Sequence, residues 1–381
     1  MSDVFDLPPA SPPQYHDRSS TAGIMWTVTA CLLPAAAWGA FVFGARALVV
    51  LGLSVAAAIL AEGAASRLAG RRTLQDGSAV LAGLLIGMSM PPSVPLFIPV
   101  TAAAFAMLVV KWSFGGLGTN WMNPALAGRV FVFFSWSGSM TGWTMPRAFA
   151  GTDGVSGATP RGIVKAAQNG LTGNGTGPLA LLRQEGYPIS TMDTGVTEWL
   201  NSYLLGPLGI NLPDGYVDLF VGNVSGSIGE VSAVLLLLGT IVLFARGIVR
   251  WQVPAVYFAT FAVLTRIFGG LAYGQGFFSG DVLFATLTGG FILVLFFMAT
   301  DPVTSPVTRK GMMLYGAGAG LLTFLLRTYG QFPESVALAV ILMNILVPVI
   351  DRSSQPRRFG AGGRSASRGA ARAGKEGRRG T

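Results

Sequence analysis

The chain has 381 residues, of which 51% are hydrophobic and only 11% are charged, and its net charge is +9. Soluble domains usually carry about 25% charged residues, so this composition excludes a soluble enzyme, a disordered chain and a coiled coil. The mean hydropathy of +0.56 instead predicts an all-α integral membrane protein, because helices satisfy their own backbone hydrogen bonds in lipid.

The first 21 residues form a polar segment without the basic start of a cleavable signal peptide, so we expect the first hydrophobic segment to remain in the mature protein. His16 is the only histidine and Cys31 is the only cysteine. One residue of each kind excludes an intrachain disulfide, a cysteine-held iron–sulfur cluster and a His-rich metal site. We therefore expect no metal site in this chain.

Ten apolar segments are candidates for membrane-spanning helices, which need about 20 apolar residues each. They are 22–43, 47–65, 77–90, 95–112, 124–138, 228–245, 253–271, 281–300, 311–326 and 334–350. The third and fifth segments are short, and four prolines lie between residues 91 and 99. Short or broken spans are tolerated where protein rather than lipid surrounds them.

Basic residues gather at alternate connections, and nine of the 26 Lys and Arg residues lie in the tail. The positive-inside rule then places both termini in the cytoplasm. Anionic lipid at that membrane face explains the basic tail, so we expect no binding of nucleic acid. The predicted regions are a cytoplasmic segment 1–21, a five-helix membrane repeat 22–138, an extracytoplasmic loop 139–227, a second five-helix membrane repeat 228–350 and a basic, disordered cytoplasmic tail 351–381.

The two halves resemble each other weakly. With an offset of 204 residues Glu62 aligns with Arg266, and with an offset of 212 residues Gly118 aligns with Gly330. An odd number of spans in each half gives the halves opposite orientations, which is the inverted-repeat plan with broken helices near the midplane. The alternative is chance similarity between Ala- and Leu-rich helices.

The most specific pattern lies in the predicted extracytoplasmic loop. Its residues are Asp153, Ser156, Gly157, Ala158 and Thr159. Small residues let a bulky group approach the backbone, and the threonine offers a hydroxyl that can be esterified. Taken alone, the stretch is also compatible with an ordinary glycine-rich turn.

This Asp-x-x-Ser-Gly-Ala-Thr stretch resembles the flavinylation motif of two related membrane proteins. They are the B subunit of the sodium-pumping NADH:quinone oxidoreductase and the D subunit of the Rnf electron-transport complex. The resemblance implies that Thr159 carries FMN through a phosphoester bond that a dedicated flavin transferase installs. It also implies a second, noncovalent flavin, riboflavin, whose site the sequence does not reveal.

The resemblance covers residues 14–352. Further stretches that fit the family are 115–129, 222–230, 299–306 and 344–351. Only about 20 residues precede the first hydrophobic segment, which resembles the Rnf D subunit, whereas the sodium-pump B subunit carries a longer extension. The B subunit remains the alternative.

Two acids at the ends of predicted spans are candidates for an ion path. The resemblance implies that Asp76 and Asp351 match acids linked to cation passage. Acids at membrane depth are costly and therefore suggest function. The structural alternatives are a helix start for Asp76 and interfacial pairing with Arg352 for Asp351.

Three residues near the fifth span are candidates for a flavin neighbourhood. Asn120 and Asn123 can hydrogen-bond a flavin edge or satisfy freed backbone groups, and Arg129 can attract an anionic flavin or pair with an acid. From the repeat alignment, Arg266 is also expected to be a structural partner of Glu62.

The resemblance implies a membrane subunit of an Rnf-type complex that passes electrons between ferredoxin and NAD and moves Na⁺ or H⁺. Its expected partners are the A, B, C, E and G subunits in the cell inner membrane. The chain lacks iron–sulfur ligands and a nucleotide-binding fingerprint, so it is not expected to be catalytic alone. A small-solute channel and a cofactor-free scaffold are the alternatives, and bound flavin distinguishes the first interpretation from both.

Overall fold

The computed structural model describes residues 20–71, 73–150, 157–169, 176–230, 232–330, 332 and 334–355. Within this part of the chain every regular element is a helix. Four helices are long and apolar enough to cross a membrane, and four shorter apolar helices accompany them. The predicted all-α integral membrane class is therefore confirmed.

The first half consists of helices joined by tight, capped connections. They are α1 (Thr21–Phe43), α2 (Ala45–Leu68), the 3₁₀ turn η1 (Leu74–Asp76), α3 (Ser78–Met88), α4 (Phe97–Ala104), its π-helical continuation η2 (Phe105–Trp112) and α5 (Pro124–Ser135). Gly44, with φ of 86°, separates α1 from α2. Asn123 caps α5 by accepting from the Ala125 amide at 2.9 Å, and Pro124 occupies the first helical position.

The second half repeats this order of elements. They are α12 (Ala233–Ala245), α13 (Gln252–Phe268) with η5 (Gly269–Tyr273), α14 (Val282–Leu287), α15 (Phe291–Leu293) with η6 (Val294–Met298), α16 (Arg309–Thr328) and α17 (Ser335–Ser354). All ten predicted segments contain helix. The segment 281–300 is broken, because Gly289 and Gly290 have φ of 64° and 66° and interrupt the helix.

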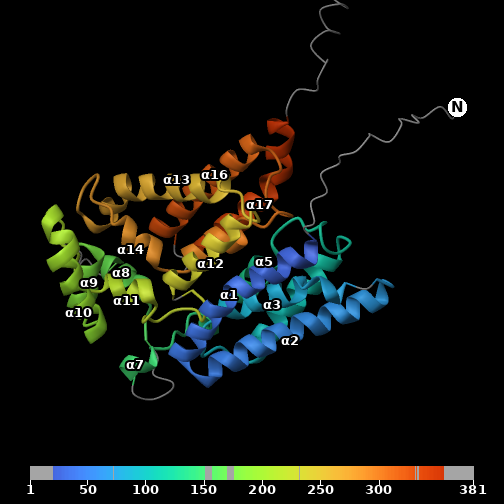
Figure 1. Ribbon diagram of the computed structural model, residues 1–381, viewed down its shortest axis with the longest axis horizontal. Coiled ribbons are helices and arrows are strands. Elements are labelled where there is room, and N and C mark those ends of the chain that lie inside the picture. The colour runs from blue at the N-terminus through green and yellow to red at the C-terminus, as the bar shows by residue number, and fades with distance from the viewer. Residues whose placement is uncertain are drawn as a thin grey trace, which may run out of the picture.

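Packing within the two halves follows the same pattern. In the first half α2 packs on α4 and α4 on α5, and in the second half α13 packs on α16 and α16 on α17. The first helices of the halves, α1 and α12, pack against each other and join the halves. Figure 1 shows the two halves side by side. This order supports the predicted repeat, and the opposite orientation of the halves stays a prediction.

The described residues from 137 to 221, which connect the two halves along the chain, form a set of short helices. They are α6 (Ser137–Met140), α7 (Arg147–Ala150), α8 (Pro160–Asn169), α9 (Pro178–Gln184), α10 (Thr191–Leu200), η3 (Asn201–Leu205), η4 (Gly206–Leu208) and α11 (Tyr216–Val221). Figure 1 shows α8 to α11 gathered at one end of the molecule. Asp193 of α10 holds the start of α11, because its buried carboxylate accepts from the amides of Gly215 and Asp218, both at 2.7 Å.

Candidate functional site

Thr159 begins α8 from its capping position. Its Oγ1 accepts from the Gly162 amide at 3.0 Å, and Pro160 is the first residue of the helix. The free amides and the dipole of a helix N-terminus favour a negative group there. Gly157 and Ala158 immediately precede Thr159, whereas the motif residues Asp153 and Ser156 lie outside the described residues.

Thr159 opens onto a cavity of about 190 Å³, here called the Thr159 cavity. Its walls are mostly apolar, and its polar and glycine residues come from α5, the start of α8, the segment before α12, the break after α14 and the residue before α17. These lining residues include Arg129, Thr159, Arg161, Lys165, Ser227, Glu230, Gly289, Gly290 and Glu334. The broken helix therefore borders the same space as the threonine hydroxyl.

Arg129 pairs with two carboxylates, Glu230 and Glu334, in the lining of the Thr159 cavity. Its Nε lies 2.6 Å from Glu334 Oε2 and its Nη2 donates to Glu334 Oε1 at 2.8 Å, while its Nη1 pairs with Glu230. The Arg129 side chain is 5% exposed and both carboxylates are 7% exposed. Such buried charges need this pairing, because an isolated ion inside protein is very costly.

Glycines at the helix break make room for the network. A Cβ on Gly290 would overlap the Glu230 carboxylate, and the positive φ of this residue also disfavours a side chain. Arg327 of α16 donates to the carbonyls of Thr288 at 2.5 Å and Gly289 at 3.0 Å. This arginine thus satisfies the acceptors that the broken helix leaves free.

Arg161 and Lys165 add two further positive charges beside Thr159, outside the spanning helices. Burial lowers the pKa of Arg161 to about 10. The pKa of Lys165 is also lowered, first by burial and second by the charge of Arg161. An anion placed here would stabilise the charged forms of both side chains, because it would offset their desolvation and their mutual repulsion. This end of the cavity therefore favours an anionic group.

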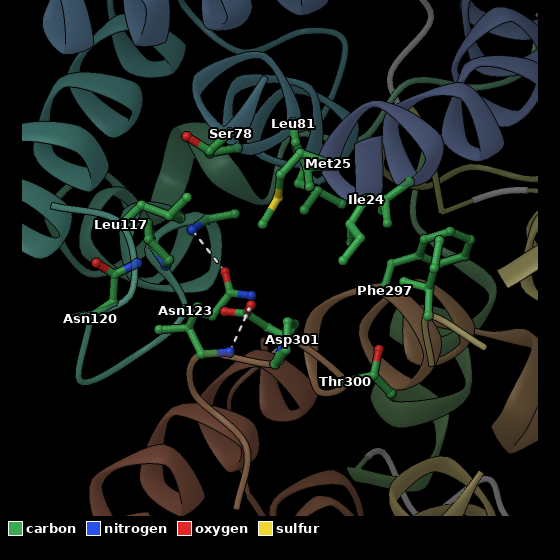
Figure 2. A pocket seen from close by; sticks show the side chains of 18 of the residues that line it. Ile24, Met25, Ser78, Leu81, Leu117, Asn120, Asn123, Phe297, Thr300 and Asp301 are labelled. Carbon is green, nitrogen blue, oxygen red and sulfur yellow. Dashed lines mark hydrogen bonds between the residues drawn. The ribbon is translucent and has the colours of Figure 1, made fainter. Parts of the chain in front are cut away.

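A second cavity, of about 90 Å³, lies between the two halves and is here called the Asn123 cavity. Its walls are mostly apolar, and its polar members are Ser78, Lys111, Asn120, Asn123, Thr300 and Asp301. Figure 2 shows Asn123 and Asp301 close together between apolar side chains such as Met25 and Phe297. The amide of Asn123 also joins the halves, because its Nδ2 donates to the Met298 carbonyl at 3.1 Å.

Glu62 and Lys111 form a buried ion pair at the edge of the Asn123 cavity. The distance between Lys111 Nζ and Glu62 Oε2 is 2.9 Å. Arg266, the predicted partner of Glu62, instead donates to the Gly280 carbonyl at 3.3 Å, so that prediction is wrong. Residues aligned by a repeat occupy equivalent places in different halves, and equivalence does not bring them into contact.

The two candidate ion-path acids lie at helix ends. Asp76 Oδ1 accepts from the Ser78 amide at 2.8 Å and from its hydroxyl at 2.5 Å, which holds the first residue of α3, while Gly77 occupies the capping position. Asp351, in the last turn of α17, accepts from the Val307 amide at 3.2 Å. Asp76 therefore connects to the Asn123 cavity through Ser78, whereas Asp351 tethers the connection before α16.

The predicted flavin neighbourhood is divided between the two cavities. Arg129 lines the Thr159 cavity, and Asn120 and Asn123 line the other one. Sequence reasoning missed Lys111, Arg161, Lys165, Glu230 and Glu334 as site residues. The available signal was the position of Lys111 and Glu230 within or next to apolar segments, where charge is costly.

These features define an all-α membrane protein with two mostly apolar cavities, one that holds three basic and two acidic residues beside an esterifiable threonine and one between two repeated halves. The chain belongs to the NQR2, RnfD, RnfE family, whose model matches residues 9–360. The resemblance inferred from the motifs is thereby confirmed.

Three relatives, each named as the D subunit of an ion-translocating complex, show how far the similarity reaches. The one from the proton-translocating ferredoxin:NAD(+) oxidoreductase complex of Clostridium ljungdahlii is 38% identical over 92% of this chain and 95% of the relative. Its counterpart in the Na(+)-translocating ferredoxin:NAD(+) oxidoreductase complex of Acetobacterium woodii is 34% identical over 93% and 96%. The relative from the ion-translocating oxidoreductase complex of Stutzerimonas stutzeri is 37% identical over 91% and 94%.

Proposed function

We propose that this chain is the D-type membrane subunit of an Rnf-type, ion-translocating ferredoxin:NAD oxidoreductase complex, and that it carries FMN esterified to Thr159. Relatives with that name match nearly the whole chain. The observation that carries the flavin proposal is the position of Thr159 at the N-terminus of α8, facing a cavity lined by three basic side chains.

The residues around Thr159 fit a phosphoester. The Arg161 amide and the Arg161 and Lys165 side chains would hold the phosphate at the start of α8, since helix N-termini and cations both favour it. Once attached, FMN supplies one- and two-electron redox chemistry at this face of the membrane. Glu230 and Glu334 hold the Arg129 guanidinium at the inner end of the same cavity.

The lining of the Asn123 cavity suits a second, noncovalent flavin such as riboflavin, although its volume of about 90 Å³ has to widen to admit one. Its walls are apolar with a few amides, which is the usual lining of a cofactor pocket. Within the part of the chain that the structure describes, Asn120 Oδ1 is buried and has no hydrogen-bond partner. A bound ring with polar edges would give this oxygen a donor.

The proposed setting is a multi-pass protein of the cell inner membrane with both termini in the cytoplasm. Electrons would pass between this chain and the G subunit, with A, B, C and E subunits completing the complex and a flavin transferase maturing it. Moving one charge against 100 mV costs about 2.3 kcal/mol, which a flavin redox step of a few tenths of a volt exceeds. The B subunit of a sodium-pumping NADH:quinone oxidoreductase is the alternative within the family.

Flavin fluorescence in a denaturing gel tests the proposal. The full chain from its native host should give a fluorescent band, because a phosphoester survives denaturation, and the Thr159→Ala variant should give none. Thr141→Ala is a matched control, since Thr141 also lines the Thr159 cavity. A dark wild-type band beside another fluorescent protein of the same complex would reject the flavin carrier and favour a channel or scaffold.

A further inference from the structure

An open groove lies where the connection between α12 and α13 meets the start of α16. Its volume is about 750 Å³, and its lining includes Phe244, Arg250, Trp251, Gln252 and Arg309. This volume falls within the range of about 300–1,000 Å³ that is usual for small-molecule sites. The function proposed above gives the groove no role, and its two arginines line neither the Thr159 cavity nor the Asn123 cavity.

The groove is positively charged, and no carboxylate of the described chain lines it. Arg250 and Arg309 are both exposed, and neither side chain has an ion pair or hydrogen bond with another described residue. Arg309 also begins α16, whose first turn leaves backbone N–H groups without a helical acceptor. Because guanidinium groups and helix N-termini both favour a phosphate, the groove suits a phosphate-bearing ligand.

The equivalent arginine of the first half is satisfied by the chain itself. With the offset of 204 residues, Arg46 aligns with Arg250. Arg46 donates to the carbonyls of Pro92 at 3.0 Å and Ser93 at 3.1 Å. Arg250 has no such acceptor within the described residues. The second half therefore offers, at this position of the repeat, a guanidinium that is free for a ligand.

A buried acceptor in the groove adds a second requirement. Gln252 begins α13 and is 9% exposed. Its Oε1 is buried and has no hydrogen-bond partner among the residues that the structure describes. A buried acceptor without a partner is costly, so a ligand that places a hydroxyl group beside it is favoured. The ligand that fits the groove thus combines an anionic group with a hydroxyl donor.

Exposed aromatic side chains border the groove. Trp251 is 59% exposed, and Phe244, in the last turn of α12, is 37% exposed. They lie at the ends of two apolar helices, where aromatic residues are typical of the membrane–water interface. Acyl chains can cover these rings while a headgroup reaches the arginines. A free phosphate would leave the rings uncovered, so a lipid is the favoured source of the anion.

We propose that the groove between α12, α13 and α16 binds an anionic phospholipid with a glycerol headgroup, phosphatidylglycerol. Arg250 and Arg309 hold its phosphate, and Gln252 Oε1 accepts from a headgroup hydroxyl. Trp251 packs against the start of the acyl chains. The site goes beyond the proposed redox function and rests only on the membrane class of the chain.

Native mass spectrometry of the delipidated full chain in detergent tests the proposal. The wild type should bind phosphatidylglycerol at least about ten-fold more tightly than zwitterionic phosphatidylcholine, and Arg250→Gln combined with Arg309→Gln should lose this preference. Arg67→Gln, at an exposed arginine in the last turn of α2, is the matched control and should keep it. Equal binding of both lipids by the wild type, or an equal loss in Arg67→Gln, would overturn the proposal.

Thermal unfolding checks that the double arginine variant is folded. In lipid-free detergent it should unfold at the wild-type temperature, because both side chains are exposed and unpaired among the described residues.

Phosphatidic acid tests the headgroup assignment, because it carries the phosphate without the glycerol. Gln252→Leu should weaken binding of phosphatidylglycerol about five-fold, since one hydrogen bond is lost, and should leave binding of phosphatidic acid unchanged. Unchanged affinity for phosphatidylglycerol in this variant would contradict the role of Gln252 and the choice of lipid. Thr159→Ala should keep wild-type lipid binding, so failure of the flavin proposal and failure of this one are distinguishable.

Discussion

Arg129 connects three segments of the chain because its guanidinium is buried between two carboxylates. It projects from α5, Glu230 lies before α12 and Glu334 lies before α17. The sequence predicted that Arg129 attracts an anionic flavin or pairs with an acid. It could not name the partners, because they are 101 and 205 residues away along the chain and only the fold brings them together.

Arg129→Met should destabilise the protein strongly, because it leaves two buried carboxylates without a counter-charge. Breaking a buried pair in this way typically costs about 3–5 kcal/mol. Thermal unfolding in detergent measures the effect. Arg250→Met, at an exposed arginine, should change stability by less than about 0.5 kcal/mol.

The same measurement on Arg129→Met combined with Glu230→Gln and Glu334→Gln separates charge from packing. This triple variant should recover most of the lost stability, because no uncompensated charge remains. A triple variant as unstable as Arg129→Met would show that packing, and not charge, accounts for the loss.

Helices of the two halves approach closely where glycines face backbone. A Cβ on Gly39 of α1 would overlap the Ile228 carbonyl, and one on Gly239 of α12 would lie 2.7 Å from the Cys31 carbonyl. Small residues permit such close helix packing in membranes. Apolar segments predicted these helices, but they missed the short helices of 139–227, of which α11 begins at amides that the Asp193 carboxylate accepts from.

Gly39→Ala tests this close approach. The added methyl group has to push the backbone at Ile228 away, and overpacking of this kind costs about 1–3 kcal/mol. Gly52→Ala on α2 is the control, because a Cβ there meets nothing within 4 Å. Equal thermal stability of the two variants in detergent would contradict the packing seen between α1 and the segment before α12.

At the scale of the whole molecule, composition predicted the membrane class and the spaced motifs predicted the family, which the comparisons confirm. The cavities could not be predicted. The Asn123 cavity, for example, combines Met25, Lys111, Asn123 and Asp301, which lie far apart in the sequence. Such a space exists only once the halves pack. Prediction from residue types alone therefore placed Asn123 and Arg129 in one flavin neighbourhood, whereas the structure places them in different cavities.

The orientation in the membrane is a further prediction for the whole molecule. In a Cys31→Ser background, Leu208→Cys should react with a membrane-impermeant maleimide in intact cells, because the positive-inside rule places 139–227 outside. Val307→Cys should react only after permeabilisation. Both positions are well exposed, at 70% and 74%. The reverse labelling pattern would invert the proposed topology.

Peptide mass spectrometry of the chain purified with its native complex tests the central claim most directly. The peptide that contains Thr159 should carry the mass of one FMN less one water, and fragmentation should place that mass on Thr159. An unmodified Thr159 peptide from a complex whose other flavin-bearing protein is modified, or FMN attached to a different residue, would contradict the account.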